Sequence, residues 1–357
     1  MPRGQTSYML LSDFSTDYVA SLVLVGAVKF CVRPPAGAPK WVLIASDAGE
    51  IRVFNESGVH QPGSDIDLGW NPDQVAINNE DPPKILIRRH STLSIHLYES
   101  GVESWNVAGI TYMIQALISD GWVHTLLSRT GYGANCGTEW RSLTDGAIDQ
   151  GIRGISPIST CYAIALSVTE SGEAVYYMWT SRTGSSPYYY PIYIRREDRS
   201  AGVAYNSLLT TQYNSKSGGV QETKTCADGS LVICVFYRVL AVRSQLFLRR
   251  GSDGAGLYTA YAGGNGIYRL SVNPAGTWAG YLYTDDLHLL TALGAHTTVV
   301  MGAAHAADYG CFDITDDPHF VCLLNNGDIE IYDDGLVLKA TIAYDLTNSP
   351  IAVVRNT

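Results

Sequence analysis

Few residues in this 357-residue chain have the types and spacing that chemistry requires. The stretch "FDITDDPHF" gathers Asp313, Asp316, Asp317 and His319, and convergent carboxylates can bind a hard cation. Asp and Pro also favour turns, so a solvated loop explains the same cluster. Cys136 lies in the glycine-rich stretch "GYGANCG" without a recognisable histidine partner, and nucleophile and phosphate-loop motifs are missing. We therefore predict no catalytic residue, no metal site and no cofactor.

Aromatic residues offer binding chemistry instead. The chain has 23 Tyr, and the stretch "YYYPIYIRRE" places several of them beside two arginines. Tyr and Arg are enriched at the centres of binding interfaces. The alternative is an ordinary β-strand with Tyr on both of its faces. The predicted binding residues are Tyr188, Tyr189, Tyr190, Tyr193, Arg195 and Arg196.

Composition limits the class of protein. Hydrophobic residues make up 46% and charged residues 16%, which indicates a well-packed body. A formal net charge of -10 disfavours a broad electrostatic grip on nucleic acid. No apolar run approaches the roughly 18 residues of a membrane-spanning helix, and the N-terminal stretch lacks the apolar region of a signal peptide. We expect no nucleic-acid partner, no membrane span, and synthesis in a host cytoplasm without a signal peptide.

The seven cysteines have irregular spacing, and several lie in apolar runs such as "SLVICVFYR". An odd number at irregular spacing does not suggest a disulfide framework. We predict reduced, buried thiols that pack as small hydrophobic side chains.

The elements that must position these residues are β-hairpins. An apolar run, a short polar or Gly turn, and a second alternating run recur along the chain. The first strand of each pair is nearly all apolar, as expected for a strand buried on both faces. A third short strand follows several pairs, as in "VESWNVAG" and "LYTAYAGG". The predicted hairpins cover residues 40–58, 84–101, 112–131, 161–184, 230–254, 277–294 and 319–335.

These hairpins return roughly every 40 to 50 residues, which is the spacing of β-propeller blades. The sequence therefore predicts an all-β fold, a single β-propeller domain over residues 1–357 with seven or eight blades of antiparallel strands. Eight follows if every hairpin has its own blade, and seven if the close hairpins at 84–101 and 112–131 share one. Two β-sandwich domains are the alternative, although no linker divides the chain.

Two segments complete this prediction. The C-terminal "SPIAVVRNT" has the character of an inner strand, and the N-terminal stretch supplies strands that lack one, so both ends are expected to share a blade and close the ring. A long irregular insertion is predicted at about 185–229, which either contains extra strands or projects from one face.

The tetrapeptide "SRTG" occurs at 128–131 and 181–184, each time after the second strand of a predicted hairpin. With Gly137, Thr138 and Trp140, Ser128 resembles the Asp-box hairpin of sialidase-type propellers, although Thr130 stands where that family has Asp. In that family the box holds a turn, so the resemblance implies a structural repeat of the blade. No pattern selects the Arg, Tyr, Glu and Asp residues that sialidase chemistry would need.

The composition, poor in Lys and rich in Tyr and Gly, resembles that of bacteriophage virion components, among which tail, nozzle and fibre proteins use propellers. The resemblance implies a non-enzymatic structural or host-attachment subunit of a virion, partnered by the protein subunits of a larger assembly. The alternatives are a lectin that binds a cell-surface glycan, a sialidase-like glycosidase, and a scaffold of the WD40 type without its signatures.

Overall fold

The computed structural model describes most of the chain. The described residues are 4–11, 17–24, 28–32, 40–55, 60–128, 136–152, 161–182, 189–213, 221–238, 243–263, 267–283, 286–300, 312–314, 320–323, 329–332 and 338–342. The cluster around Asp316, Asp317 and His319 therefore lies outside the described residues, as does Tyr188.

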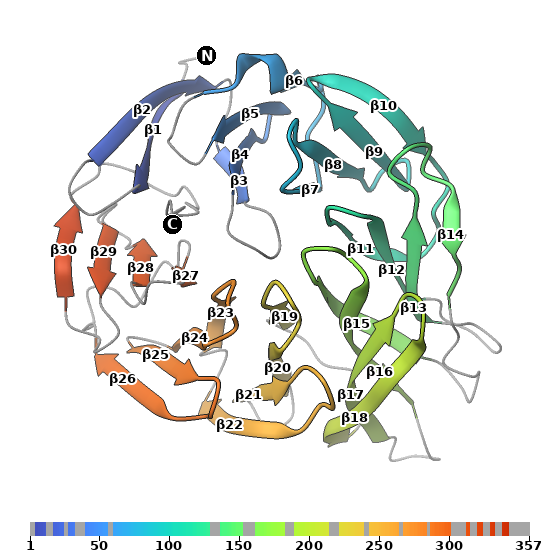
Figure 1. The fold of residues 1–357 in the computed structure, drawn as a ribbon, viewed down its shortest axis with the longest axis vertical. Coiled ribbons are helices and arrows are strands. Elements are labelled where there is room, and N and C mark those ends of the chain that lie inside the picture. The colour runs from blue at the N-terminus through green and yellow to red at the C-terminus, as the bar shows by residue number, and fades with distance from the viewer. Residues whose placement is uncertain are drawn as a thin grey trace.

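Within these residues the strands form seven four-stranded antiparallel sheets and one two-stranded sheet, arranged as a ring (Figure 1). Each four-stranded sheet is a blade, and its strands follow chain order from the inside of the ring to the outside. The first three blades are β3 (Val28–Val32), β4 (Trp41–Ser46), β5 (Glu50–Asn55), β6 (Ile66–Asp67); β7 (Gln74–Ile77), β8 (Lys84–Arg89), β9 (Ser94–Glu99), β10 (Val102–Val107); and β11 (Met113–Ile118), β12 (Val123–Ser128), β13 (Cys136–Arg141), β14 (Ile148–Gln150).

The remaining blades continue around the ring. They are β15 (Cys161–Val168), β16 (Ala174–Ser181), β17 (Tyr189–Asp198), β18 (Gly202–Tyr213); β19 (Gln221–Thr225), β20 (Leu231–Arg238), β21 (Arg243–Arg250), β22 (Gly256–Gly263); β23 (Ile267–Val272), β24 (Trp278–Tyr283), β25 (Asp286–Thr291), β26 (His296–Val300); and β27 (Phe312–Ile314), β28 (Phe320–Leu323), β29 (Ile329–Tyr332), β30 (Leu338–Ile342). One short 3₁₀ helix, η1 (Pro62–Ser64), precedes β6.

All seven predicted hairpins are present as paired strands. Most of them are the second and third strands of a blade, whereas 112–131 and 161–184 are the first and second. The hairpin at 84–101 thus ends one strand before its blade does, and the hairpin at 112–131 begins the next blade. This explains why the two hairpins lie close in sequence yet belong to separate blades.

The two-stranded sheet pairs β1 (Gly4–Leu11) with β2 (Asp17–Leu24), between blades β27–β30 and β3–β6 in the ring (Figure 1). Residues 343–357 lie outside the described residues. Closure of the ring by a C-terminal strand in this sheet therefore stays a prediction, as does an eighth four-stranded blade.

The described part of the segment at 185–229 contains extra strands, which is one of the two alternatives that the sequence left open. Residues 189–198 and 202–213 form β17 and β18, which pair along their whole length and complete the fourth blade in chain order. Strand β17 is rich in Tyr and Ile and β18 contains Tyr and Thr, residue types that favour extended backbone. Their length, not a projecting loop, explains the long interval between apolar runs.

The apolar core lies between neighbouring blades. One cluster joins Leu43 and Val53 of blade β3–β6 to Ile77 and Ile87 of blade β7–β10, and four further clusters join the next four pairs of blades. A sheet with two apolar faces cannot bury both alone, so each blade depends on its neighbours. Full burial of an Ile or Val side chain stabilises the fold by about 1.5–3 kcal/mol.

The repeated "SRTG" marks the same position in consecutive blades. Ser128 ends β12 and Ser181 ends β16, which are the second strands of their blades. Ser128 Oγ accepts a hydrogen bond from the backbone N–H of Ala163 in the next blade (3.1 Å). Trp140 is fully buried and donates from Nε1 to the carbonyl of Gly172 in that blade (3.0 Å). Ser128 and Trp140 therefore connect two blades.

Among the described residues, no helix has the length and apolar character needed to cross a membrane.

Candidate functional site

The five predicted Tyr and Arg residues that the structure describes do not form one exposed surface. They lie along β17, and alternate side chains of this strand enter the two interfaces that its blade forms with its neighbours. Tyr190 and Arg195 are only 7% and 6% exposed, whereas Tyr189 is 36% exposed. Tyr193 stacks on Trp179 with ring centroids 4.7 Å apart. The structure therefore uses most of this stretch for packing between blades.

Arg195 belongs to a closed polar network. Its Nε lies 2.7 Å from Glu197 Oε1, and the Tyr177 hydroxyl donates to the same carboxylate over 2.7 Å. Thr138 of the preceding blade donates to Glu197 Oε2 (3.4 Å). Burial raises the pKa of Glu197 although Arg195 opposes this shift. Because Glu197 is fully buried, the network ties blades together and is closed to a ligand.

Arg196 points to the opposite interface. Its Nε pairs with Asp198 (2.7 Å), and its NH1 donates to the carbonyl of Gly251 in the next blade (2.9 Å). The guanidinium carbon also lies 5.7 Å from the centroid of the Tyr176 ring. Arg196 thus fastens blade β15–β18 to blade β19–β22.

The inner strands carry a repeated side-chain clamp. Gln74 of β7 donates from Nε2 to the carbonyl of Ala116 (2.7 Å) and accepts from its N–H (3.0 Å). Gln115 of β11 accepts from the N–H of Leu166 in β15 (2.9 Å), and Glu222 of β19 accepts from that of Leu270 in β23 (3.3 Å). Each clamp binds the edge of the next inner strand, whose backbone groups no sheet partner covers.

The clamp positions are equivalent because each lies four residues before the first residue of the turn that ends its strand. In each case the side chain of this turn residue accepts a hydrogen bond from a backbone N–H at or just before the start of the following strand. The turn residues are Asn78, Ser119, Thr169, Cys226 and Asn273. In β15 the clamp position is Ala165. Alanine has no acceptor to offer the equivalent backbone position of the next inner strand, which is Thr223.

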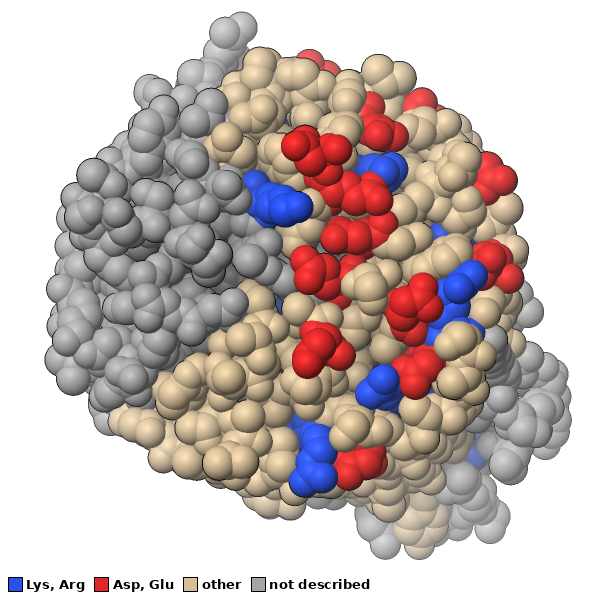
Figure 2. All heavy atoms as spheres, in the orientation of Figure 1, with Lys and Arg blue, Asp and Glu red and all other residues tan. Residues whose placement is uncertain are grey.

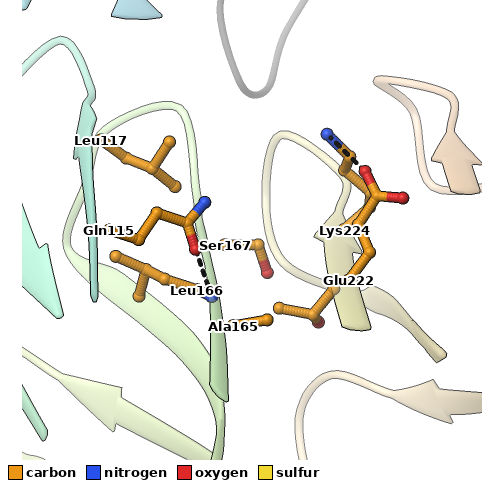
Figure 3. Close-up of a pocket in the computed structure, with 8 residues that line it drawn as sticks. Gln115, Leu117, Ala165, Leu166, Ser167, Glu222 and Lys224 are labelled. Carbon is orange, nitrogen blue, oxygen red and sulfur yellow. Dashed lines mark hydrogen bonds and ion pairs between the residues drawn. The ribbon is translucent and has the colours of Figure 1, made fainter. Parts of the chain in front are cut away.

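A pocket of about 100 Å³ lies where this clamp is missing. Gln115 and Ser167 lie on one side of it, and Glu222 and Lys224 on the other (Figure 3). Ser167 is 5% exposed, and its Oγ is buried without a hydrogen-bond partner. We call this the inner-strand pocket; its lining comes from β11, β15 and β19 and consists of Gln115, Leu117, Ala165, Leu166, Ser167, Glu222, Thr223 and Lys224.

The turns after these strands form a hydrogen-bonded chain from blade to blade. The backbone N–H of Asp120 donates to the carbonyl of Glu170 (2.9 Å), that of Glu170 to Ala227 (3.0 Å), and that of Ala227 to Pro274 (3.0 Å). Burial and the nearby Glu170 and Glu80 carboxylates raise the pKa of Asp120. Figure 2 shows acidic side chains gathered with fewer basic ones on the described part of one face.

Apolar side chains are exposed on the outermost strand of four consecutive blades. Their exposures range from 47% for Val203 to 68% for Val102. Figure 1 places these strands on the circumference of the ring. We call them the outer apolar residues; they are Val102 of β10, Ile148 of β14, Val203 and Leu208 of β18, and Tyr261 of β22.

The described side chains include no group of three His, Cys, Asp or Glu that could hold a metal ion. Cys136, Cys161, Cys226 and Cys234 are buried and take part in no disulfide, which confirms the prediction for these four thiols.

Sequence reasoning missed the clamps and the pocket. A signal was present, because the turns "SDG", "TESG", "CADG" and "NPAG" align the inner strands. With that alignment, and with Asn78 aligned to the same turns, Gln74, Gln115 and Glu222 fall at one position, which Ala165 and Arg269 occupy in β15 and β23.

No protein-family model matches the chain, and no curated protein sequence matches it. Its fold is similar to solved structures of very different sequence. Hsv2 of Kluyveromyces lactis matches with a TM-score of 0.56 at 9% identity, over 88% of this chain and 98% of that one. BamB from Moraxella catarrhalis matches with a TM-score of 0.53 at 12% identity, over 90% and 92% of the two chains.

The β-propeller domain of Cps50 (Swd1) from Myceliophteria thermophila matches with a TM-score of 0.55 at 9% identity, over 86% of this chain and 97% of that one. The ring of four-stranded antiparallel sheets and these matches together define the chain as a β-propeller. At such low identity the likeness shows the fold alone, and function must be argued from the surface of this chain.

Proposed function

We propose that this β-propeller is a non-enzymatic interaction platform whose circumference docks onto neighbouring protein subunits of a larger assembly. The observation that carries the proposal is the position of the outer apolar residues, which recur on the outermost strand of successive blades. Burial of apolar surface contributes about 25 cal/mol per Å² to association.

The outermost strands offer a second means of contact. Each is the edge of its sheet, so one row of its backbone N–H and C=O groups has no strand partner within that sheet. Strand β18 has 12 residues and carries two of the outer apolar residues, Val203 and Leu208. A partner can therefore combine apolar contacts with strand addition along β18.

The larger assembly that we propose is a bacteriophage virion, with this chain as a rigid subunit of its tail, nozzle or fibre. Support comes from the composition, poor in Lys and rich in Tyr and Gly, and from a ring braced by hydrogen bonds between blades. A rigid ring suits assembly because association then orders few further groups.

The test is sedimentation of the particle fraction from the cells that make the protein, with detection of this chain. Stoichiometric migration with a large assembly is expected. Val203→Asp with Leu208→Asp should abolish it, because two carboxylates would enter an apolar contact. Ser200→Asp, at the exposed turn between β17 and β18, adds charge outside that contact and should not.

A free monomer in the source would contradict the proposal. Glycan-array binding and glycosidase assays would then test the lectin and glycosidase alternatives.

A further inference from the structure

The inner-strand pocket lies where one repeated contact is interrupted. In three described blades, an amide or carboxylate oxygen accepts the edge N–H of the next inner strand. Gln74 also donates to the carbonyl of the same residue, so a carboxamide satisfies both backbone groups at this position. At Thr223 the preceding blade offers only the methyl group of Ala165.

Polar groups around the gap match the missing carboxamide. Ser167 Oγ is buried, has no partner and lines the pocket, so it can donate or accept one hydrogen bond there. Gln115 uses its Oε1 on Leu166, and its Nε2 lies on the pocket side (Figure 3). An unsatisfied buried hydroxyl costs roughly 1–3 kcal/mol, which a polar ligand would recover.

The size of the pocket also suits such a group. A volume of about 100 Å³ corresponds to about three water molecules of liquid, or a fragment of about four or five heavy atoms. The end of a Gln side chain is of this size. A sugar ring is too large to enter whole.

We propose that the inner-strand pocket binds the primary carboxamide of a Gln or Asn side chain on a partner polypeptide segment that enters along the inner side of the ring. Its carbonyl oxygen accepts from the backbone N–H of Thr223, and its amide group donates to Ser167 Oγ. Glu222 and Lys224, paired at 3.2 Å, form the polar edge of the site. The site is independent of the outer apolar residues, so either proposal can fail alone.

The first experiment is an NMR titration of the full chain with propionamide, which mimics the end of the Gln side chain. Saturable shifts are expected at the backbone amides of Thr223 and Ser167, with a Kd on the order of millimolar for a fragment of five heavy atoms. Propionate, of the same shape but negatively charged, should bind more weakly because it would bring a second carboxylate beside Glu222. Absence of saturable shifts would overturn the proposal.

The second experiment rebuilds the clamp within the chain. Ala165→Gln should raise the Tm by a few degrees and abolish the propionamide shifts, because the new side chain occupies the site. Ala165→Leu has a similar size without polar atoms and should not raise the Tm. Propionamide shifts that persist in a folded Ala165→Gln variant would show that the fragment binds elsewhere.

Two further outcomes decide the source of the group. Ser167→Ala should weaken propionamide binding several-fold. Tighter binding of N-acetylglucosamine than of propionamide, at the same resonances, would overturn the polypeptide assignment in favour of a glycan.

Discussion

The hydroxyl of Tyr177 donates to Glu197 Oε1 over 2.7 Å, and both side chains are fully buried. They come from neighbouring strands of one blade, and Thr138 reaches the same carboxylate from the blade before it. Arg195 supplies the compensating charge 2.7 Å away. The segment that looked most like a binding site in the sequence is thus a charged joint between blades.

This joint predicts a large loss of stability when its carboxylate is removed. Glu197→Ala should lower the free energy of unfolding by about 3–5 kcal/mol, because it leaves the Arg195 charge buried without its partner. Glu197→Gln should cost less, since an amide oxygen can still accept from Tyr177. Urea unfolding of both variants measures the difference, and equal stability of Glu197→Ala and the wild type would contradict the role of the joint.

The turn between β15 and β16 predicts a position that tolerates only glycine. Gly172 has φ +73°, and a Cβ there would contact Ser119 Oγ and approach His124 Nε2 to 2.7 Å in the neighbouring blade. Gly172→Ala should therefore combine left-handed backbone strain with overpacking and cost about 2–4 kcal/mol.

Gly69 is the matched control. Its φ is +68°, but nothing lies within 4 Å of an added Cβ. Gly69→Ala should cost only the backbone term, about 1–2 kcal/mol. Thermal unfolding of the two variants separates the terms, and equal losses would show that the contact with Ser119 and His124 relaxes freely.

The sequence predicted the hairpins because their strands carry apolar runs. It did not reveal inner strands such as β7 and β19, which have four and five residues and begin with polar Gln74 and Gln221. These short strands pack against strands of the preceding blade, a tertiary contact that no local pattern encodes. The periodicity of the sequence therefore could not show which two strands of its blade each hairpin forms.

The prediction of binding residues in the Tyr and Arg stretch failed for a related reason. Tyr and Arg suit both an exposed interface and a buried, hydrogen-bonded blade joint. Which of these applies depends on whether another blade covers each face of β17. Arg195 and Arg196 are neighbours in sequence, yet they enter opposite interfaces.

The buried thiols predict slow chemical modification. Burial raises the pKa of Cys234 to about 11, and the hydrogen bond with Cys161 together with burial raises that of Cys136. Since the thiolate is the reactive form, N-ethylmaleimide should modify neither residue in the native protein but both in urea. Peptide mass spectrometry provides the measurement, and rapid native labelling of Cys234 would show that its blade interface opens.

The histidine pair in blade β23–β26 predicts a loss of stability in acid. His288 Nδ1 and His296 Nε2 are 2.8 Å apart, and Thr298 Oγ1 contacts both residues. The surrounding groups are Tyr258, Tyr281 and Tyr283, and Tyr281 stacks on His288 at 4.4 Å. Burial and the neighbouring His296 lower the pKa of His288 to about 4, and burial lowers that of His296.

The sign follows from linkage. In the unfolded chain His288 takes up a proton below pH about 6.5, whereas in the fold it stays neutral until about pH 4. Its neutral form therefore contributes full stability above pH 6.5, and this contribution declines as the pH falls towards 4, by on the order of 2–3 kcal/mol. His124, fully buried with a pKa lowered to about 3, adds to the same trend.

Urea unfolding at pH 7.5 and 4.5 tests this dependence. His288→Gln should lose stability at pH 7.5 but show a smaller drop between the two pH values, because it removes a group that titrates in the unfolded state alone. His90→Gln, in the exposed turn after β8, should retain the drop of the wild type. An unchanged drop in His288→Gln would mean that His288 is protonated equally in both states, and the stacked pair would then have no part in acid sensitivity.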